Sequence, residues 1–225
     1  METLQISNIQ REFEKNGFFI IKNCYSKEET NFVKKYSHEM NNNEVGGVRV
    51  IVPDELPQAL KEFVCHDQIK ENLMEVFSSQ IEFLSVKPVY KNSKVSFGTP
   101  WHQDWQYWKG ESHKISVWVA LDNATIENGC LKVIPGSHKN KYEHQSLDGE
   151  FGERIKESNL NDEITLDVLM NSGDALFFHD QLVHSSNPNT SSGERWSFIS
   201  TYRDASLEDK GCALYDTTWQ TRLKL

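Results

Sequence analysis

Apart from one short apolar run, the apolar residues among the first 80 recur at the spacing of helices,. Gly17 ends a polar helical stretch, and the apolar residues 18–21 (FFII) after it predict a short buried strand,. Ser26 and Glu29 stand three residues apart in the pattern of a capping box, which predicts the start of a helix,. Two helices are expected, over residues 28–40 and over residues 56–77, the second with an apolar stripe of Leu60, Phe63, Val64 and Leu73,.

From residue 81 the spacing of the apolar residues changes to the period of strands,. Turn-forming pairs such as Asn128-Gly129 and Pro135-Gly136 separate the apolar runs,. Strands are predicted over residues 81–90, 114–121, 130–134, 164–169, 175–178, 181–184 and 196–202. Helices followed by many short strands, with no helices between the strands, predict a β-rich α+β fold.

A length of 225 residues suits one domain with its own core, so residues 1–225 are predicted to form a single unit,. Residues 1–80 would supply the N-terminal strand and helices, residues 81–204 the strand-rich core, and residues 205–225 a C-terminal tail. Residues 138–162 are polar and charged, and we interpret them as an insertion between strands that could act as a mobile lid,.

One short segment carries the residue types of a metal site. Trp101-His102-Gln103-Asp104 contains the only His-x-Asp of the chain. In an extended segment, residues i and i+2 point to the same side, so His102 and Asp104 can both reach one ion. A surface histidine and aspartate in a polar loop is the alternative, and so short a motif has that meaning more often.

A second segment contains a candidate third metal ligand and an arginine that could bind a carboxylate. The apolar run 175–178 leads to His184, which would complete a set of two imidazoles and one carboxylate. Such a facial triad leaves three coordination positions open and suits non-haem iron(II). Eleven residues further on, Arg195 and Ser197 share one strand face, where a guanidinium can bind a carboxylate through two parallel hydrogen bonds,. This order of residues predicts 2-oxoglutarate chelated at the metal, with its distal carboxylate at Arg195.

Three other residues near this pattern have competing interpretations. His179 lies five residues before His184 and is the rival ligand, although a packing role is favoured for it. Trp105 and Trp108 could contact the substrate, since ligand sites are often lined by aromatic side chains, or could pack within the fold,.

Five blocks of sequence carry a further signal: GFFIIKNCYSKEE, FLSVKPVY, WHQDWQYW, NGCLKVIPGSHK, and GDALFFHDQLVHSSNPN followed by ERWSF. Together they resemble the phytanoyl-CoA dioxygenase family of iron(II)/2-oxoglutarate-dependent oxygenases, over nearly the whole chain. The resemblance implies a double-stranded β-helix, the cupin-like jelly roll, with flanking N-terminal helices and the metal at its open mouth. It implies iron(II) ligands at His102, Asp104 and His184. It also implies cosubstrate contacts at Arg195, Ser197 and Lys87.

The resemblance further implies a reaction. 2-Oxoglutarate and O2 would be consumed, an unactivated C–H of a small metabolite would be hydroxylated, and succinate and CO2 would be released. Asp104 favours hydroxylation, because related halogenases lack this carboxylate and bind a halide in its place. WHQDWQYW is also similar to the block of ectoine hydroxylases, from which the following KGESHKI departs. Two alternatives stay open: a cupin-like metal protein such as an isomerase or zinc-dependent hydrolase, and a catalytically silent binding protein.

Charge and composition narrow the partners. The formal net charge of −9 and the pI near 5.4 disfavour a surface for nucleic acid or anionic membrane, and also disfavour coenzyme A thioesters,. The opening METLQISNIQREFEKN is too polar for a signal peptide, and no apolar run approaches the ~20 residues of a membrane span,. The scattered residues Cys24, Cys65, Cys130 and Cys212 indicate free thiols,. We therefore expect a cytoplasmic enzyme for a small-molecule substrate, with no oligomeric state indicated.

Overall fold

The strands of the protein form two main antiparallel sheets. The computed structural model describes residues 7–40, 47–48, 50–77, 80–94, 96–146, 153–160, 163–209, 211–214 and 223–225. The larger sheet contains β1 (Phe18–Ile21), β2 (Gly47–Val48), β3 (Ile81–Lys91), β6 (Lys114–Ala120), β11 (Ala175–His179), β13 (Arg195–Asp204) and β15 (Leu223–Lys224). The smaller sheet contains β4 (Thr99–His102), β7 (Leu131–Val133), β10 (Leu166–Val168) and β12 (His184–Ser186).

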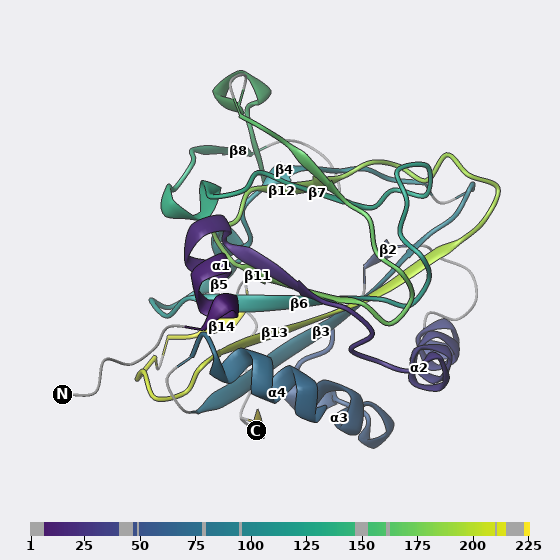
Figure 1. The fold of residues 1–225 in the computed structure, drawn as a ribbon, viewed down its shortest axis with the longest axis horizontal. Helices are drawn as coiled ribbons and strands as arrows, with labels where there is room; N and C mark the ends of the chain where they lie inside the picture. The colour runs from purple at the N-terminus through teal and green to yellow at the C-terminus, as the bar shows by residue number, and fades with distance from the viewer. Residues whose placement is uncertain are drawn as a thin grey trace.

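The strand order shows how distant parts of the chain meet. The larger sheet runs β1-β11-β6-β13-β3-β15, with β2 also paired to β3, and the smaller sheet runs β10-β7-β12-β4. Two further antiparallel pairs join β5 (Trp108–Lys109) to β14 (Ala213–Leu214) and β8 (His144–Ser146) to β9 (Glu153–Ile155). The smaller sheet lies opposite one face of the larger sheet (Figure 1). The β-rich architecture predicted from the sequence is therefore confirmed.

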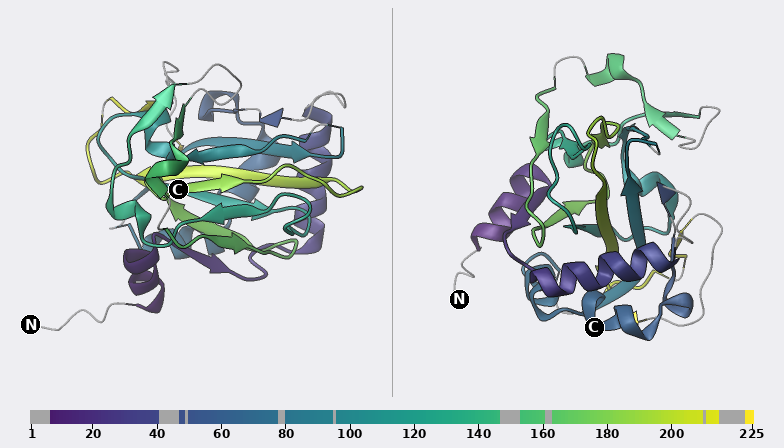
Figure 2. Two further views of the ribbon diagram at one scale, coloured as in Figure 1. Left: turned by 90° about the horizontal axis from the view of Figure 1, so that it is seen from above. Right: turned by 90° about the vertical axis from the view of Figure 1, so that its right-hand side faces the viewer.

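Three helices, α2 (Lys27–Met40), α3 (Gln58–Val64) and α4 (Asp67–Met74), pack on the outer face of the larger sheet (Figures 1 and 2). The helix α1 (Asn8–Asn16) lies beside the end of β11. Short 3-10 turns are η1 (Pro53–Glu55), η2 (Asp104–Tyr107), η3 (Ser137–Lys139) and η4 (Glu157–Leu160). Among the described residues, no helix has the length and apolar character that crossing a membrane requires.

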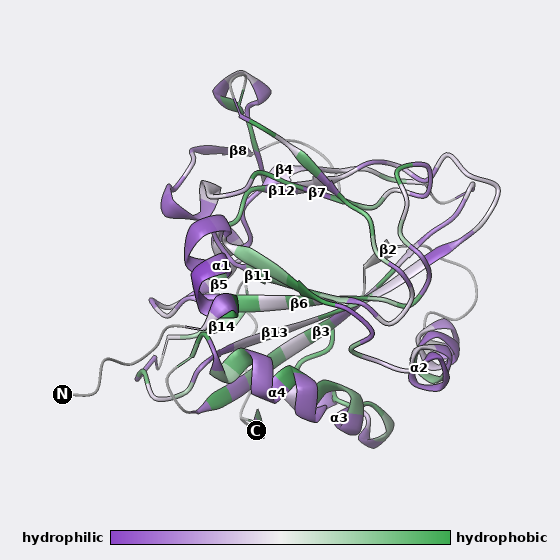
Figure 3. Cartoon of the chain, viewed as in Figure 1, coloured by the Kyte–Doolittle hydropathy of each residue, from purple (hydrophilic) through white to green (hydrophobic). Residues whose placement is uncertain are grey.

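The alternation of side chains along the strands builds two cores. On β11, Phe177 points toward the helices and packs in one core with Phe63. Leu176 and Phe178 point the other way and pack with Trp118 between the two sheets. In Figure 3, β11 and parts of β6 are hydrophobic, whereas α1 and α2 are largely hydrophilic. Because the two faces of the larger sheet are both covered, its strands are apolar on both sides, as their near-continuous apolar sequences indicate.

The N-terminal elements begin and end where the sequence predicts. α1 ends at Gly17, whose φ of 81° is the left-handed conformation typical of a glycine after a helix,. The capping box precedes α2: the Ser26 amide donates to Glu29 Oε2 at 2.8 Å, and the Glu29 amide donates to Ser26 Oγ at 3.2 Å,.

The single helix predicted over residues 56–77 is wrong, because the structure divides it into α3 and α4. In a continuous helix the carbonyls of Phe63 and Val64 would accept the amides four residues ahead. They instead accept the hydroxyls of Tyr25 and Tyr202, each at 2.7 Å. Two tyrosines from distant strands and loops thus replace helical hydrogen bonds, which the periodicity of the segment could not reveal.

The proposed insertion and the proposed C-terminal tail both contain strands. The proposed insertion 138–162 contains β8, β9 and η4, while residues 147–152 and 161–162 lie outside the described residues. The proposed tail 205–225 contributes β14 and β15, while residues 210 and 215–222 lie outside the described residues.

Candidate active site

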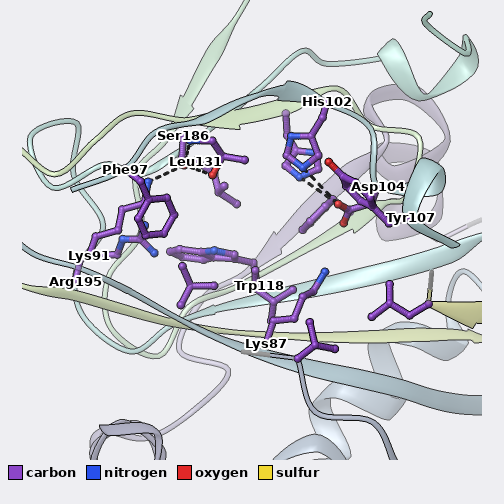
Figure 4. A pocket seen from close by; sticks show the side chains of 17 residues that line it. Lys87, Lys91, Phe97, His102, Asp104, Tyr107, Trp118, Leu131, Ser186 and Arg195 are labelled. Carbon is purple, nitrogen blue, oxygen red and sulfur yellow. Dashed lines mark hydrogen bonds and ion pairs between the residues drawn. The ribbon is translucent and has the colours of Figure 1, made fainter. Parts of the chain in front are cut away.

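Three side chains with metal-binding atoms meet between the sheets. His102 ends β4, Asp104 begins η2, and His184 begins β12. His102 and His184 are direct partners across the antiparallel pair of β4 and β12, with ring centroids 4.1 Å apart. Asp104 Oδ1 lies 3.5 Å from His102 Nε2 and 3.8 Å from His184 Nε2 (Figure 4). The sequence predicted this group, and strand pairing brings it together.

Backbone carbonyls fix the tautomer of both imidazoles. His102 Nδ1 lies 2.8 Å from Pro100 O, and His184 Nδ1 lies 2.9 Å from Leu182 O. A carbonyl oxygen only accepts, so each Nδ1 must carry the proton and donate it. Each Nε2 then presents a lone pair toward Asp104. A histidine held through one nitrogen by a carbonyl, with the other nitrogen free, is the usual arrangement of a metal ligand.

The charges around the group favour the protonation states that a metal requires. Burial raises the pKa of Asp104, but the charges of Lys87 and of the two histidines outweigh it and hold this pKa well below its ordinary value. Burial and the neighbouring His102 lower the pKa of His184 to about 4. At neutral pH the group therefore consists of a carboxylate and a neutral imidazole at His184, both ready to bind a cation.

A cavity of about 290 Å³ extends from this group to Arg195. That volume is at the small end of the range for ligand sites. Its walls are largely apolar and aromatic, and its lining includes Val50, Val89, Phe97, Tyr107, Trp118, Leu131, Phe178, Ile199 and Leu214. Figure 4 shows Trp118 below the space between the His102 end and the Arg195 end. The cavity therefore has two polar ends joined by an apolar middle.

The second polar end holds two buried cations. Arg195 is 2% exposed and Lys91 is 1% exposed, and both line the cavity. Neither forms a salt bridge with an acidic residue in the described part of the chain. Burial lowers the pKa of Arg195 to about 10, and burial together with the charge of Arg195 lowers the pKa of Lys91 to about 7. Two buried basic side chains without an ion-pair partner in the described part of the chain favour an anionic occupant.

Lys91 was missed at the sequence level. Its Nζ donates to Ser186 Oγ at 2.7 Å and to Asn187 O at 2.8 Å, which holds it at the cavity wall. Lys87, Val89 and Lys91 alternate along β3 and all line the cavity,. The family resemblance implied Lys87 at the site, and the period of two along this strand could then have placed Lys91 there as well,.

Of the remaining predicted residues, one lines the cavity and the others do not. Lys87 lines it, and Ser197 is fully buried and accepts Arg195 Nη1 at 2.7 Å. Trp105 and Trp108 are absent from the described lining. Trp108 packs in a separate core with Leu84, and the Trp105 indole donates to Gln103 Oε1 at 3.0 Å. Contact of the two tryptophans with a substrate stays a prediction.

His179, the rival ligand, lies outside the group formed by His102, Asp104 and His184. It ends β11 and forms part of a different cluster with His113 and Asp180. His184 pairs directly with His102 between β12 and β4, which places its ring beside Asp104. His179 has no such pairing with His102 among the described strands.

Gln103 points away from the metal-binding group and joins the two ligand segments to the proposed insertion. Its Nε2 donates to Asn140 O at 2.8 Å and to Gln181 O, and its Oε1 accepts the Tyr142 amide at 3.0 Å. Its own amide donates to His144 Nε2 at 3.0 Å. Since Gln103 is fully buried and its side chain satisfies four partners, it fixes the backbone between two candidate ligands,.

We expect Gln103→Glu to lower the free energy of unfolding by about 1–3 kcal/mol, because a carboxylate oxygen would replace the amide that faces two carbonyls,. Urea denaturation of the metal-free protein measures this loss. Gln68→Glu, the same change at an exposed position of α4, should alter stability little. Equal losses for the two variants would contradict the role assigned to Gln103.

The sequence pattern of the phytanoyl-CoA dioxygenase (PhyH) family matches residues 13–197. The chain belongs to this family. The match includes every residue of the metal-binding group and the buried Arg195 and Ser197. Residues 198–225, with the end of β13, lie beyond it.

Curated relatives in the family carry different names. The chain is 28% identical to the peroxisomal phytanoyl-CoA dioxygenase of Bos taurus, over 88% of this chain and 68% of that protein. It is 26% identical to the probable alpha-ketoglutarate-dependent hypophosphite dioxygenase of Stutzerimonas stutzeri, over 92% of this chain and 82% of that protein. Family membership therefore leaves the substrate open.

Solved structures share the fold. The epimerase SnoN, determined with Fe3+, alpha-ketoglutarate and nogalamycin RO, superposes with a TM-score of 0.74 at 18% identity, covering 88% of this chain and 84% of SnoN. The alpha-ketoglutarate-dependent carbocyclase SnoK superposes with a TM-score of 0.74 at 22% identity, covering 91% of this chain and 85% of SnoK. This phytanoyl-CoA dioxygenase family member thus has the architecture of these proteins.

Proposed function

We propose that the protein is an iron(II)/2-oxoglutarate-dependent dioxygenase that hydroxylates an unactivated C–H of a small metabolite. One observation carries the proposal: a cavity with a group of two histidines and one aspartate at one end, and at the other two buried basic side chains with no ion pair among the described residues. A metal-chelating dianion such as 2-oxoglutarate matches both ends.

His102, Asp104 and His184 would hold the iron. Their donor atoms all lie within 4.8 Å of one another, and two imidazole nitrogens with one carboxylate are the ligand set of non-haem iron(II) oxygenases,. The carbonyls of Pro100 and Leu182 keep both Nε2 lone pairs directed at the ion. Ser116 Oγ donates to Asp104 Oδ2 at 3.3 Å and so leaves Oδ1 for the metal.

Arg195 and Lys91 would bind the distal carboxylate of 2-oxoglutarate. Arg195 Nη1 and Nη2 already donate to Ser197 Oγ and Gly129 O, at 2.7 and 3.2 Å. The buried Nε of Arg195 has no partner among the described residues and remains available as a donor. Ser197 would position the guanidinium, and Lys87, beside Asp104, would add a positive charge near the metal-chelating end.

The bound iron would supply the activation of O2, coupled to the conversion of 2-oxoglutarate into succinate and CO2. The residues of the chain would bind and orient 2-oxoglutarate and the substrate, and would exclude water from the cavity. Trp118 and Phe178 form apolar walls between the two polar ends and keep the reacting atoms dry,. Asp104 would occupy a position that a halide needs in a halogenase, which favours transfer of oxygen.

The size of the cavity supports a small substrate. Tyr107, whose ring centroid lies 5.9 Å from that of His102, is placed to contact a substrate beside the metal. The acidic chain, with its net charge of −9, offers little attraction to nucleic acids, to anionic membranes or to coenzyme A thioesters,.

We propose that the two facing sheets form a double-stranded β-helix, a jelly roll, and that the chain is a single catalytic domain. The order of the antiparallel strands in two opposed sheets supports this topology. We also propose a cytoplasmic location, because Cys24, Cys65, Cys130 and Cys212 are all free, as in a reducing compartment,.

Lys91→Met should raise the apparent KM for 2-oxoglutarate by roughly tenfold at pH 6.5, since one charge-assisted contact is removed. In the wild type, this KM should rise as the pH increases through about 7, because Lys91 then loses its proton and its positive charge. Steady-state kinetics across pH 6–9 would show the rise in the wild type and a flatter profile in the variant. The same pH profile in both proteins would remove Lys91 from the anion site.

The proposed activity is tested by incubating the protein with iron(II), ascorbate and 2-oxoglutarate labelled at C1, against a panel of small metabolites. A true substrate should increase the release of labelled CO2 well above the rate without substrate, and mass spectrometry should find one added oxygen in it. A product that is an epimer or a new ring would keep the cosubstrate assignment but exclude hydroxylation. No labelled CO2 with any substrate would favour a silent binding protein.

A further inference from the structure

A second cluster of metal-binding side chains lies outside the cavity. It contains His113, His179 and Asp180, whose donor atoms all lie within 4.8 Å of one another. His113 precedes β6, His179 ends β11, and Asp180 follows it, so the pairing of β11 with β6 brings them together. The ring of Phe13 on α1 contacts His179, which places the cluster beside α1 (Figure 1).

The carboxylate of Asp180 is buried, and one of its two oxygens accepts no hydrogen bond from the described residues. Its side chain is 3% exposed, and Oδ2 accepts the Lys114 amide at 3.1 Å. Oδ1 is buried and has no hydrogen-bond partner in the described part of the chain. It lies 3.0 Å from His179 Nδ1 and 3.5 Å from His113 Nδ1. A buried carboxylate oxygen directed at two imidazole nitrogens is satisfied by a proton on one of the rings or by a metal ion between them,.

The distances fit a metal as well as those of the first group do. Bonds of about 2.0–2.1 Å in a tetrahedral zinc site place neighbouring donor atoms roughly 3.3 Å apart. The separations of Asp180 Oδ1 from the two imidazole nitrogens, 3.0 and 3.5 Å, lie on either side of this value. The corresponding separations from Asp104 are 3.5 and 3.8 Å. The carboxylate–imidazole separations of the second cluster are therefore no longer than those of the first.

The nitrogen nearest to Asp180 carries a lone pair. The Gln181 amide donates to His179 Nδ1 at 3.0 Å, so this nitrogen has no proton, and two electron-rich atoms face each other across 3.0 Å. A metal ion between them would replace this repulsion by two bonds. It would compete with the Gln181 amide for the same lone pair, which makes the site one of moderate affinity.

We propose that His113, His179 and Asp180 bind a second divalent metal ion, zinc(II), at the protein surface. The side chain of His113 is 60% exposed, so an ion can enter from solvent and keep a water in its fourth position,. Sites of nitrogen and oxygen ligands bind zinc(II) more tightly than iron(II), and since the first group has the same ligand types, it must be disabled before zinc binding at this site can be measured,. The ion would lie behind the segment that carries Asp104, because the Trp105 amide donates to Asp180 O at 2.9 Å.

The test is calorimetric titration of the full chain with zinc(II), in a variant whose first site is disabled, His102→Ala with His184→Ala. This variant should bind one zinc ion and melt at a higher temperature when zinc is present. Adding His113→Ala, a change at an exposed position, should weaken zinc binding by more than about tenfold and abolish the rise in melting temperature, since changes that only support a metal ligand already weaken binding by that factor.

His38→Ala, a second exposed histidine outside both clusters, serves as the matched control in the same background and should bind zinc unchanged. His179→Asn provides a second variant of the site itself, with the same expected loss. Absence of zinc binding in the variant with the first site disabled, or equal zinc affinity with and without His113, would overturn the proposal and leave the cluster as an ion pair of Asp180 with protonated histidines.

Discussion

Asp104→Ala is expected to abolish turnover of 2-oxoglutarate and to weaken iron(II) binding. Asp104 is the one carboxylate of the group, and its Oδ1 lies within 3.8 Å of both imidazoles. Its removal takes away the negative charge that balances the metal ion, and the neutral imidazole of His184 cannot replace that charge. His102→Ala and His184→Ala should have the same effect, because each removes an Nε2 lone pair that its carbonyl partner directs at the ion. Equilibrium dialysis with iron(II) and a succinate assay measure the two losses.

His179→Ala is the matched comparison, since it removes a histidine that lies five residues before His184 but outside the first group. It should keep measurable turnover and bind iron at the first site. All of these variants should remain folded, because the three ligands contribute little to the two apolar cores. If His179→Ala lost iron binding while His184→Ala kept it, the assignment of ligands would be wrong.

Arg195→Ala should raise the apparent KM for 2-oxoglutarate far more than it weakens iron binding. The loss of hydrogen bonds from a buried guanidinium to a carboxylate costs about 1.5–3 kcal/mol each, which corresponds to about 10- to 100-fold or more in affinity. Arg195→Lys should recover part of the affinity, because it restores the charge without the planar pair of donors. Steady-state kinetics with varied 2-oxoglutarate would separate the variants.

Arg11→Ala, which removes an exposed arginine from α1, controls for the change in net charge and should leave this KM unaltered. Equal 2-oxoglutarate affinity in the wild type and in Arg195→Ala would remove the main support for a 2-oxoglutarate site at this end of the cavity.

Local sequence signals predicted most of the helices and strands, but not the places where contacts from distant parts of the chain decide the structure. The capping box at Ser26 and the glycine at residue 17 were sufficient because the hydrogen bonds that they make are local. The division between α3 and α4 depends on Tyr25 and Tyr202, whose hydroxyls arrive from other parts of the fold. The short β4 was not predicted as a strand, because its pairing with β12 compensates for a sequence, TPWH, with little strand character.

The metal-binding group was predictable because its residue types are rare in combination and occur in a fixed order. The anion end was only partly predictable. Arg195 and Ser197 stand two residues apart on one strand. Lys91 shares the face of β3 that carries Lys87, but the contacts with Ser186 and Asn187 that hold it at the cavity wall come from nearly 100 residues away in sequence. Gln103 gave no signal of its four-partner network because three of the four partners lie in the segments around residues 140 and 181.

The most direct test of the iron and 2-oxoglutarate site requires no knowledge of the substrate. Under anaerobic conditions, iron(II) is added to the protein and 2-oxoglutarate is then titrated while the visible absorption is recorded, since chelation of iron(II) by a keto acid produces a charge-transfer band. We predict a saturable band in the wild type, its absence in His184→Ala, and saturation only at far higher 2-oxoglutarate in Arg195→Ala. A wild-type protein that binds iron(II) but develops no band, or a band that persists unchanged in both variants, would contradict the proposed function.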